Sequence, residues 1–251
     1  MAERRPVPLP GYVEDVLDAA LDKALRVQRP VIIAYLNRVR DRHRDATPAG
    51  VVRLLERRYL AAVTAVGAAS GSAAAVPGAG TGISFASAAV EISAFVEATA
   101  VFALAIAEVH GIRIDDPEIR RALVLAILIG DIGVGAAELA VADAGSRWGQ
   151  ILSRRAPDET IKRINHILSR HLLTKFGTKQ GALMLGRALP LGIGASIGAA
   201  GNLAFGRRAI LAARRMFGGP PDRLPPRVID AQIVEPVADP PGLNGKSPAG
   251  H

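Results

Sequence analysis

The chain of 251 residues contains no cysteine. This absence excludes a disulfide framework, a zinc site built on thiolates and a cysteine nucleophile. Aromatic residues make up only 4% of the chain, and there is a single tryptophan. The apolar content comes largely from small side chains, because 45 residues are alanine, and a further 26 residues are glycine. Small residues let helix backbones approach one another closely, so the composition favours tightly packed helices.

No stretch of the sequence alternates apolar and polar residues in the way that a half-buried strand does. Apolar residues instead recur at spacings of three and four, for example at Val13, Val16, Leu17 and Ala20. This spacing places them on one face of a helix. The sequence therefore predicts an all-α fold, a multi-helix bundle over residues 11–217.

Two helix starts carry a local capping signal. Thr47 precedes Pro48, which combines a capping side chain with a proline at the first helical position. Asp116 precedes Pro117 and Glu118, so a capping residue is followed by a proline and an acidic residue in the first turn. We expect one helix to begin at each of these two points.

The two ends of the chain are not expected to join the bundle. Residues 1–10 lack the apolar run of a secretory signal and predict a flexible N-terminus. Residues 218–251 contain eight of the 17 prolines and predict a disordered, proline-rich tail. Without a secretion signal, we expect the protein in the cytoplasm or on the cytoplasmic face of the membrane.

Charge is distributed unevenly along a chain whose formal net charge is +8. Residues 61–143 carry three basic and nine acidic residues, whereas residues 144–219 carry 13 basic and two acidic residues. The basic segment either complements the acidic one inside the fold or forms a cationic face for an anionic membrane. Nucleic acid is the weaker alternative, because no aromatic stacking platform or binding module accompanies the arginines.

The only tryptophan, Trp148, lies in a cationic and amphipathic segment. This pattern is typical of a membrane interface, although a core tryptophan beside a solvated basic loop gives the same pattern. The residues predicted to meet an anionic membrane surface are Arg147, Trp148, Arg154, Arg155, Arg163, Arg207, Arg208, Arg214 and Arg215.

Glycine is concentrated in two segments that predict glycine-rich helix hairpins. Residues 76–82 combine a proline with three alternating glycines, which favours a hinge or a hairpin. Asn202 and three glycines recur every four residues near the end of the chain and line one narrow helical stripe. Such a stripe lets a second helix pack at close range, in a soluble protein or in a membrane. The glycines predicted to pack helices are Gly78, Gly80, Gly82, Gly194, Gly198 and Gly206.

Four acidic residues lie within apolar segments, in two pairs whose members are eleven or seven residues apart. Each pair shares a helix face. A carboxylate in apolar surroundings needs a partner or acquires a raised pKa. Pairing with arginines such as Arg187 or Arg120, or a polar stripe facing water, is one interpretation, and a site for an ion or a proton is the alternative. The four residues are Glu97, Glu108, Asp131 and Glu138.

The motifs that would indicate an enzyme lack the context they need. Residues 194–198 match the G-x-S-x-G nucleophile elbow around Ser196, but no strand is predicted before it and only His251 follows. The glycines of residues 78–82 lack the Gly-Lys-Ser/Thr ending of a phosphate-binding loop. Helical metal motifs are absent from the sequence. We therefore expect a non-enzymatic protein without a cofactor, with a hydrolase as the weakest alternative.

Three motifs follow one another in a recognisable order. They are residues 76–82, residues 106–111 leading into 116–120, and residues 189–202. In this order they resemble the bacterial EcsC family, over about residues 10–217, although His110 stands where the family usually has Tyr. The family takes its name from a gene beside an ABC transporter linked to secretion. The resemblance implies a protein partner in a transporter system and supplies no catalytic residues.

Together these features predict a membrane-associated helical protein that assists a transport or secretion system. A soluble helical module that binds a hydrophobic or lipid-like ligand is the second interpretation. Spanning a bilayer takes about 20 mostly apolar residues. Residues 188–206 include a proline and an asparagine, and residues 83–107 include two glutamates, which are costly inside a membrane. The sequence therefore favours true spanning no more than peripheral association or an inserted hairpin.

Overall fold

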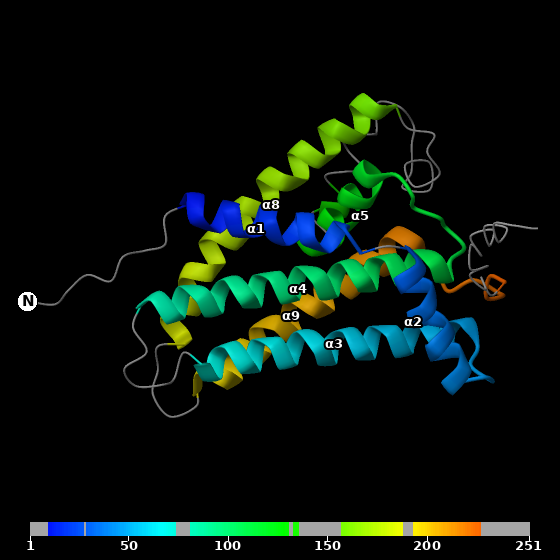
Figure 1. Cartoon of the computed structure of the whole chain (residues 1–251), viewed down its shortest axis with the longest axis horizontal. Helices are drawn as coiled ribbons and strands as arrows, with labels where there is room; N and C mark the ends of the chain where they lie inside the picture. Colours follow the sequence, from blue (N-terminus) through cyan, green and yellow to red (C-terminus); the bar gives the residue numbers. More distant parts are fainter. Residues whose placement is uncertain are drawn as a thin grey trace, which may run out of the picture.

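The computed structural model describes residues 10–27, 29–73, 81–130, 133–135, 157–187 and 193–226. These residues are predominantly helical and include no strand, which confirms the predicted all-α fold. Figure 1 shows the arrangement of the helices. The helices are α1 (Pro10–Leu25), α2 (Arg29–Arg42), α3 (Pro48–Ala73), α4 (Thr81–Val109), α5 (Pro117–Ile129), α8 (Asp158–Arg187) and α9 (Ile193–Phe217).

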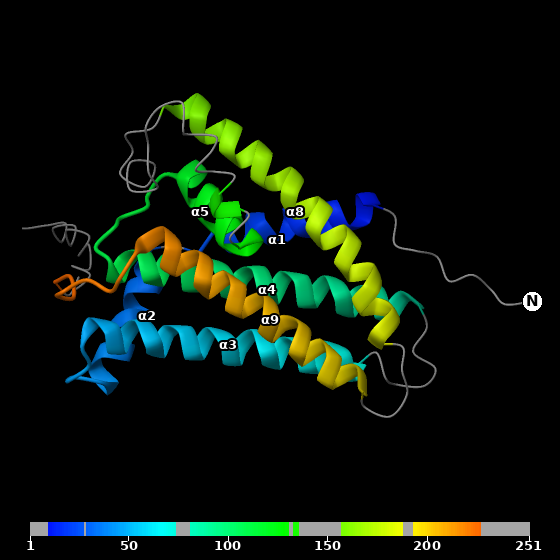
Figure 2. The ribbon, with the colours of Figure 1, turned by 180° about the vertical axis from the view of Figure 1, so that it is seen from behind.

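Three long helices, α3, α4 and α9, form one side of the bundle. Helix α3 packs most extensively against α9 and also packs against α4. Both neighbours run antiparallel to α3, and α9 crosses the α3–α4 pair obliquely, behind it in Figure 1 and in front of it in Figure 2. On the other side of the bundle, α1 packs on α4, and α5 packs between α8 and the long helices.

Helix α5 forms the centre of the core. All its residues from 122 to 129 are buried, so beyond its charged first residues this helix has no polar face. A helix that is apolar all round belongs inside a protein or a membrane, and here neighbouring helices cover it. The short α5 therefore joins the α1–α8 side of the molecule to α4 and α9.

Both predicted capping signals are confirmed. Helix α3 begins directly after Thr47, whose Oγ1 accepts a hydrogen bond of 3.1 Å from the amide of Gly50. Helix α5 begins directly after Asp116, which accepts hydrogen bonds of 2.8 and 3.2 Å from the next two free amides of the first turn. Each side chain satisfies amides that the helix itself leaves without a partner.

The expected tail begins with a segment that is attached to the helices. Helix α9 ends at Phe217, and the φ of +77° at the following Gly218 suits glycine. Arg40 of α2 then donates a hydrogen bond of 3.1 Å to the carbonyl of Pro225, and Leu224 packs on the core. Residues 1–9 and 227–251, which include most of the expected flexible ends, lie outside the described residues.

Candidate functional site

The part of the predicted cationic surface that the structure describes lies mainly on α9. This helix carries four arginines and no acidic residue. Arg207 and Arg208 are exposed, and Leu211, one turn further on, is 52% exposed. Arg163 is also exposed, but it lies on α8. Four other residues predicted for this surface lie outside the described part of the chain, namely Arg147, Trp148, Arg154 and Arg155.

Arg214 has a different role from its neighbours on α9. Its guanidinium donates hydrogen bonds of 2.7 and 2.6 Å to the two carboxylate oxygens of Glu56 on α3. These hydrogen bonds to the carboxylate raise the pKa of Arg214. Glu56 is buried, so it needs this partner. Arg214 therefore belongs to the contact between α3 and α9, which is a correction to its assignment as a surface cation alone. Arg215 also has a partner within the structure.

Two glycines of the predicted packing set lie directly against α3. A methyl group placed on Gly67 of α3 would lie 2.3 Å from the carbonyl oxygen of Gly198, so the two backbones touch. A methyl group on Gly206 would lie 2.9 Å from Cδ2 of Leu60 and Cγ2 of Val63. The glycine spacing predicted a close helix contact but could not identify its partner. Gly78 and Gly80 lie outside the described residues, and the surroundings of Gly82 and Gly194 are not described.

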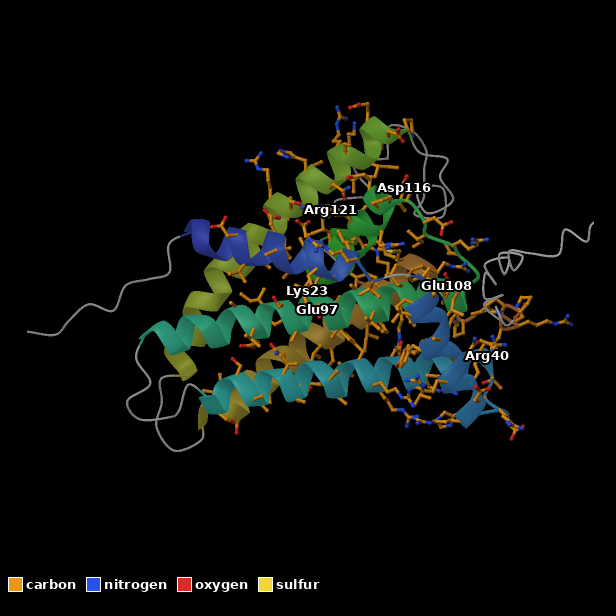
Figure 3. All side chains as sticks on the ribbon, in the orientation of Figure 1. Lys23, Arg40, Glu97, Glu108, Asp116 and Arg121 are labelled. Atoms are coloured by element: carbon orange, nitrogen blue, oxygen red, sulfur yellow. The ribbon has the colours of Figure 1, made fainter. Side chains whose placement is uncertain are left out.

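Two of the four candidate acids form ion pairs with helices that the sequence did not suggest. Glu97 lies 2.7 Å from Nζ of Lys23 on α1, and Figure 3 shows the two side chains together. Glu108 accepts two hydrogen bonds from Arg29 of α2, one of them 3.0 Å long. Asp131 and Glu138 lie outside the described residues. Among the residues described, no group of His, Asp and Glu is placed to hold a metal ion.

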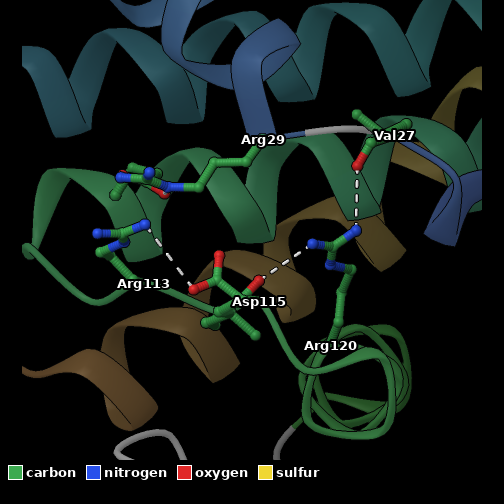
Figure 4. Close-up of polar contacts among 7 residues, drawn as sticks. Val27, Arg29, Arg113, Asp115 and Arg120 are labelled. Carbon is green, nitrogen blue, oxygen red and sulfur yellow. Dashed lines mark hydrogen bonds and ion pairs between the residues drawn. The ribbon is translucent and has the colours of Figure 1, made fainter. Parts of the chain in front are cut away.

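Arg120, the arginine suggested as a partner for these acids, binds backbone carbonyls instead. It donates hydrogen bonds of 3.1 and 3.2 Å to the carbonyls of Leu25 and Val27, at the end of α1, and one of 3.1 Å to the carbonyl of Ile114. Figure 4 shows the bond to Val27. These carbonyls include ones that α1 leaves without a helical partner. Arg120 thus ties the end of α1 to the start of α5, as a structural group.

A small crevice lies beside Arg120 and the Arg29–Glu108 pair. It has room for about one water molecule. A site for a drug-sized or lipid-like ligand needs about 300 Å³ or more. This crevice is therefore too small for such a ligand. Its lining residues are Arg29, Ile32, Leu104, Ala107, Glu108, Ile112, Ile114 and Arg120.

Helix α4 supplies the one segment of the described chain, Ala89–Val109, that is long and apolar enough to cross a membrane. Most of it is buried inside the bundle, and the core helix of a soluble protein has the same composition. Its interior polar groups also have partners. Thr99 shares a hydrogen bond of 2.9 Å with Tyr59, and Glu91 accepts one of 2.6 Å from Ser70. These contacts fit a helix that packs against protein.

Comparison with known proteins adds no relative. No family model, curated protein or solved structure matches the chain. The similarity to the EcsC family stays a prediction from the three motifs.

Proposed function

We propose that the protein is a non-enzymatic helical protein that associates with the surface of an anionic membrane. The observation that carries this proposal is the exposed pair Arg207 and Arg208 beside the exposed Leu211, on a helix without acidic residues. Arginines around an apolar side chain are typical of helices that lie at a membrane interface. Each such cation near an anionic surface contributes about 1 kcal/mol.

Helix α3 extends the same cationic face. Its exposed Arg53 precedes Glu56 by three residues, so the two lie on one side of the helix. Arg207 likewise lies two turns before Arg214 on one line of α9. Since Glu56 and Arg214 are bonded to each other, Arg53 and Arg207 border the same contact between the helices. Glu56 is the only acidic residue of the two helices, so nothing else on them neutralises these arginines.

The role in transport rests on the resemblance to the EcsC family. In this proposal the protein serves as an accessory or interaction factor of a transport or secretion system at the cytoplasmic face of the membrane. Membrane association through α9 would bring it beside a membrane-embedded partner.

Sedimentation with lipid vesicles tests the proposal. We expect binding to vesicles of phosphatidylcholine and phosphatidylglycerol, but not to phosphatidylcholine alone. Binding should weaken at high salt, because the Debye length falls from about 10 Å at 0.1 M to about 3 Å at 1 M. Replacing both Arg207 and Arg208 by Gln should weaken binding about 30-fold, since two cations contribute about 2 kcal/mol.

The matched control replaces Arg26 and Arg44 by Gln. Both side chains are exposed and lie outside α3 and α9. Because two arginines are again replaced, this variant has the same net charge as the variant of Arg207 and Arg208. We expect it to keep most of the binding. An equal loss in the two variants would show that α9 is not the binding face, and no sedimentation of the natural protein would refute membrane association.

A further inference from the structure

The charged residues of α3 and α9 end at one level of the bundle. On α3, Arg57 and Arg58 are the last charged residues, and on the antiparallel α9 the first is Arg207. The neighbouring Gly206 lies against Tyr59, since a methyl group on this glycine would be 3.7 Å from Cε1 of the ring. The two charged segments therefore stop side by side.

Beyond this level both helices are uncharged. These ends comprise residues 59–73 of α3 and 193–206 of α9. A helix on the surface of a water-soluble protein normally carries charged and polar residues on its exposed face. Among the side chains that the structure describes here, every exposed one is small and uncharged. Figure 3 shows the nitrogen-tipped side chains of α3 gathered at its other end, next to α2. The exposed residues are Ala61, Ala62, Ala65, Ala69 and Ser72 on α3 and Ser196, Ala200 and Ala204 on α9.

The polar groups within these ends are largely satisfied internally. The exposed hydroxyl of Ser72 donates a hydrogen bond of 2.8 Å to the carbonyl of Ala68 in its own helix. The buried amide of Asn202 donates one of 3.1 Å to the carbonyl of Val63 across the contact. Groups with internal partners lose little when water is replaced by lipid. The backbone contact at Gly67 also holds the two ends together as one body.

The length of the uncharged ends limits how far they could enter a bilayer. At a rise of about 1.5 Å per residue, they extend for about 21–23 Å. The hydrocarbon core of a bilayer is about 30 Å thick. The paired ends are therefore long enough to enter one leaflet and too short to cross both.

We propose that the uncharged ends of α3 and α9 enter one leaflet of an anionic membrane together, with Arg57, Arg207 and Arg208 at the level of the headgroups. This inference rests on the proposed membrane association and adds the part that inserts and its depth. Lipid is favoured over a second protein copy because arginines border the uncharged surface. Their guanidinium groups have the opposite charge to phosphate and fit its hydrogen-bonding geometry.

Single-cysteine labelling tests the insertion, and the absence of native cysteine makes each label unique. Ala65→Cys and Ala200→Cys carry an environment-sensitive fluorophore at exposed positions of the uncharged ends, and Glu159→Cys on α8 is the control. With vesicles containing phosphatidylglycerol, we expect increased emission at residues 65 and 200. Lipids that carry a quencher high on the acyl chain should then reduce the emission at these two positions. We expect neither change at residue 159.

Charge placed on the uncharged ends provides a second measurement. Ala65→Glu and Ala200→Glu should each weaken vesicle binding by about tenfold or more, because a carboxylate is costly in lipid. Ala19→Glu, at an exposed position of α1, is the matched control and should bind normally. Thermal unfolding followed by circular dichroism should be unchanged in all three variants.

The outcomes separate the two proposals. Vesicle binding with labels at residues 65 and 200 that stay in water would overturn insertion and leave surface association in place. Failure of the unlabelled protein to bind any vesicle would refute the association itself. Emission that rises with protein concentration in the absence of vesicles would assign this surface to a second copy and overturn the lipid proposal.

Discussion

Arg214 of α9 and Glu56 of α3 form a two-point ion pair between residues 158 positions apart in the chain. The carboxylate side chain is 8% exposed and the guanidinium side chain 58% exposed. The buried partner therefore depends on the exposed one for its hydrogen bonds. The pair also fixes the register of the antiparallel helices. It lies within their charged segments, before the level at which both helices become uncharged.

Removing the exposed partner should be costly. Arg214→Gln leaves the buried carboxylate of Glu56 without its cation and should lower the free energy of unfolding by about 1–3 kcal/mol. Replacing Glu56 by Gln as well should recover part of this loss, as a double-mutant cycle measured by urea unfolding would show. Arg207→Gln, on the same helix, should change stability by less than about 0.5 kcal/mol. Equal effects of Arg207→Gln and Arg214→Gln would contradict a structural role for the pair.

The backbone contact at Gly67 should tolerate no side chain. Gly67→Ala places a methyl group 2.3 Å from the carbonyl oxygen of Gly198 and should destabilise the protein by about 1–3 kcal/mol. Gly50→Ala, in the first turn of the same helix, meets only ordinary contacts of 3.4 Å or more. Because alanine favours helix, this control should stabilise by up to about 1 kcal/mol. Chemical unfolding of both variants would compare them, and a neutral Gly67→Ala would show that the helices lie further apart.

Tyr59 should make stability fall at alkaline pH. Burial raises the pKa of this phenol, so the folded protein keeps its proton where the unfolded chain loses it. The stability that Tyr59 contributes is therefore complete below the ordinary tyrosine pKa of about 10 and falls as pH rises above it. Tyr59→Phe should lose about 0.5–1.5 kcal/mol at neutral pH, because the hydrogen bond to Thr99 is absent. Its unfolding free energy should then decline less steeply above pH about 10 than that of the natural protein, and equal slopes would count against this linkage.

Arg120 should not be replaceable by lysine. Its guanidinium bonds three carbonyls at once, and a single ammonium group cannot reproduce that geometry. Arg120→Lys should therefore lower stability by about 2 kcal/mol, close to the effect of Arg120→Met. Thermal unfolding of the two variants measures the difference. Full stability in the lysine variant would mean that charge alone holds the end of α1.

The attached start of the tail should contribute to stability. A chain ending at Gly219 loses the packing of Leu224 and the bond between Arg40 and Pro225, whereas a chain ending at Pro226 keeps both. The shorter chain should be less stable by about 1–2 kcal/mol, as expected for one partly buried leucine and one hydrogen bond. Melting curves of the two truncated proteins provide the comparison. Identical curves would show that residues 220–226 do not contribute to thermal stability.

Local signals in the sequence predicted local features of the fold. Thr47 and Asp116 predicted two helix starts correctly, because a capping side chain accepts hydrogen bonds from amides only two or three residues away. The all-α class followed from spacing, since three- and four-residue periods need no knowledge of tertiary contacts. The buried α5 could have been recognised from its continuous apolar run.

Partners across the fold were beyond the reach of such signals. The spacing of Gly198 and Gly206 predicted a close contact, but nothing in the sequence pointed to Gly67 on the other side. The partners of Glu97 and Glu108 are Lys23 and Arg29, which depend on how α1 and α2 fold back on α4. These choices are set by packing among distant segments, which a single sequence does not display.

The pairing of α3 with α9 also bears on how the chain is made. The end of α3 and the start of α9 are separated by 119 residues. At synthesis rates of about 5–20 residues per second, α3 waits roughly 6–24 s for its main partner. During that interval the face of α3 that contains Gly67 is not covered by α9. A nascent chain of this design therefore exposes this surface to a chaperone until α9 has been made.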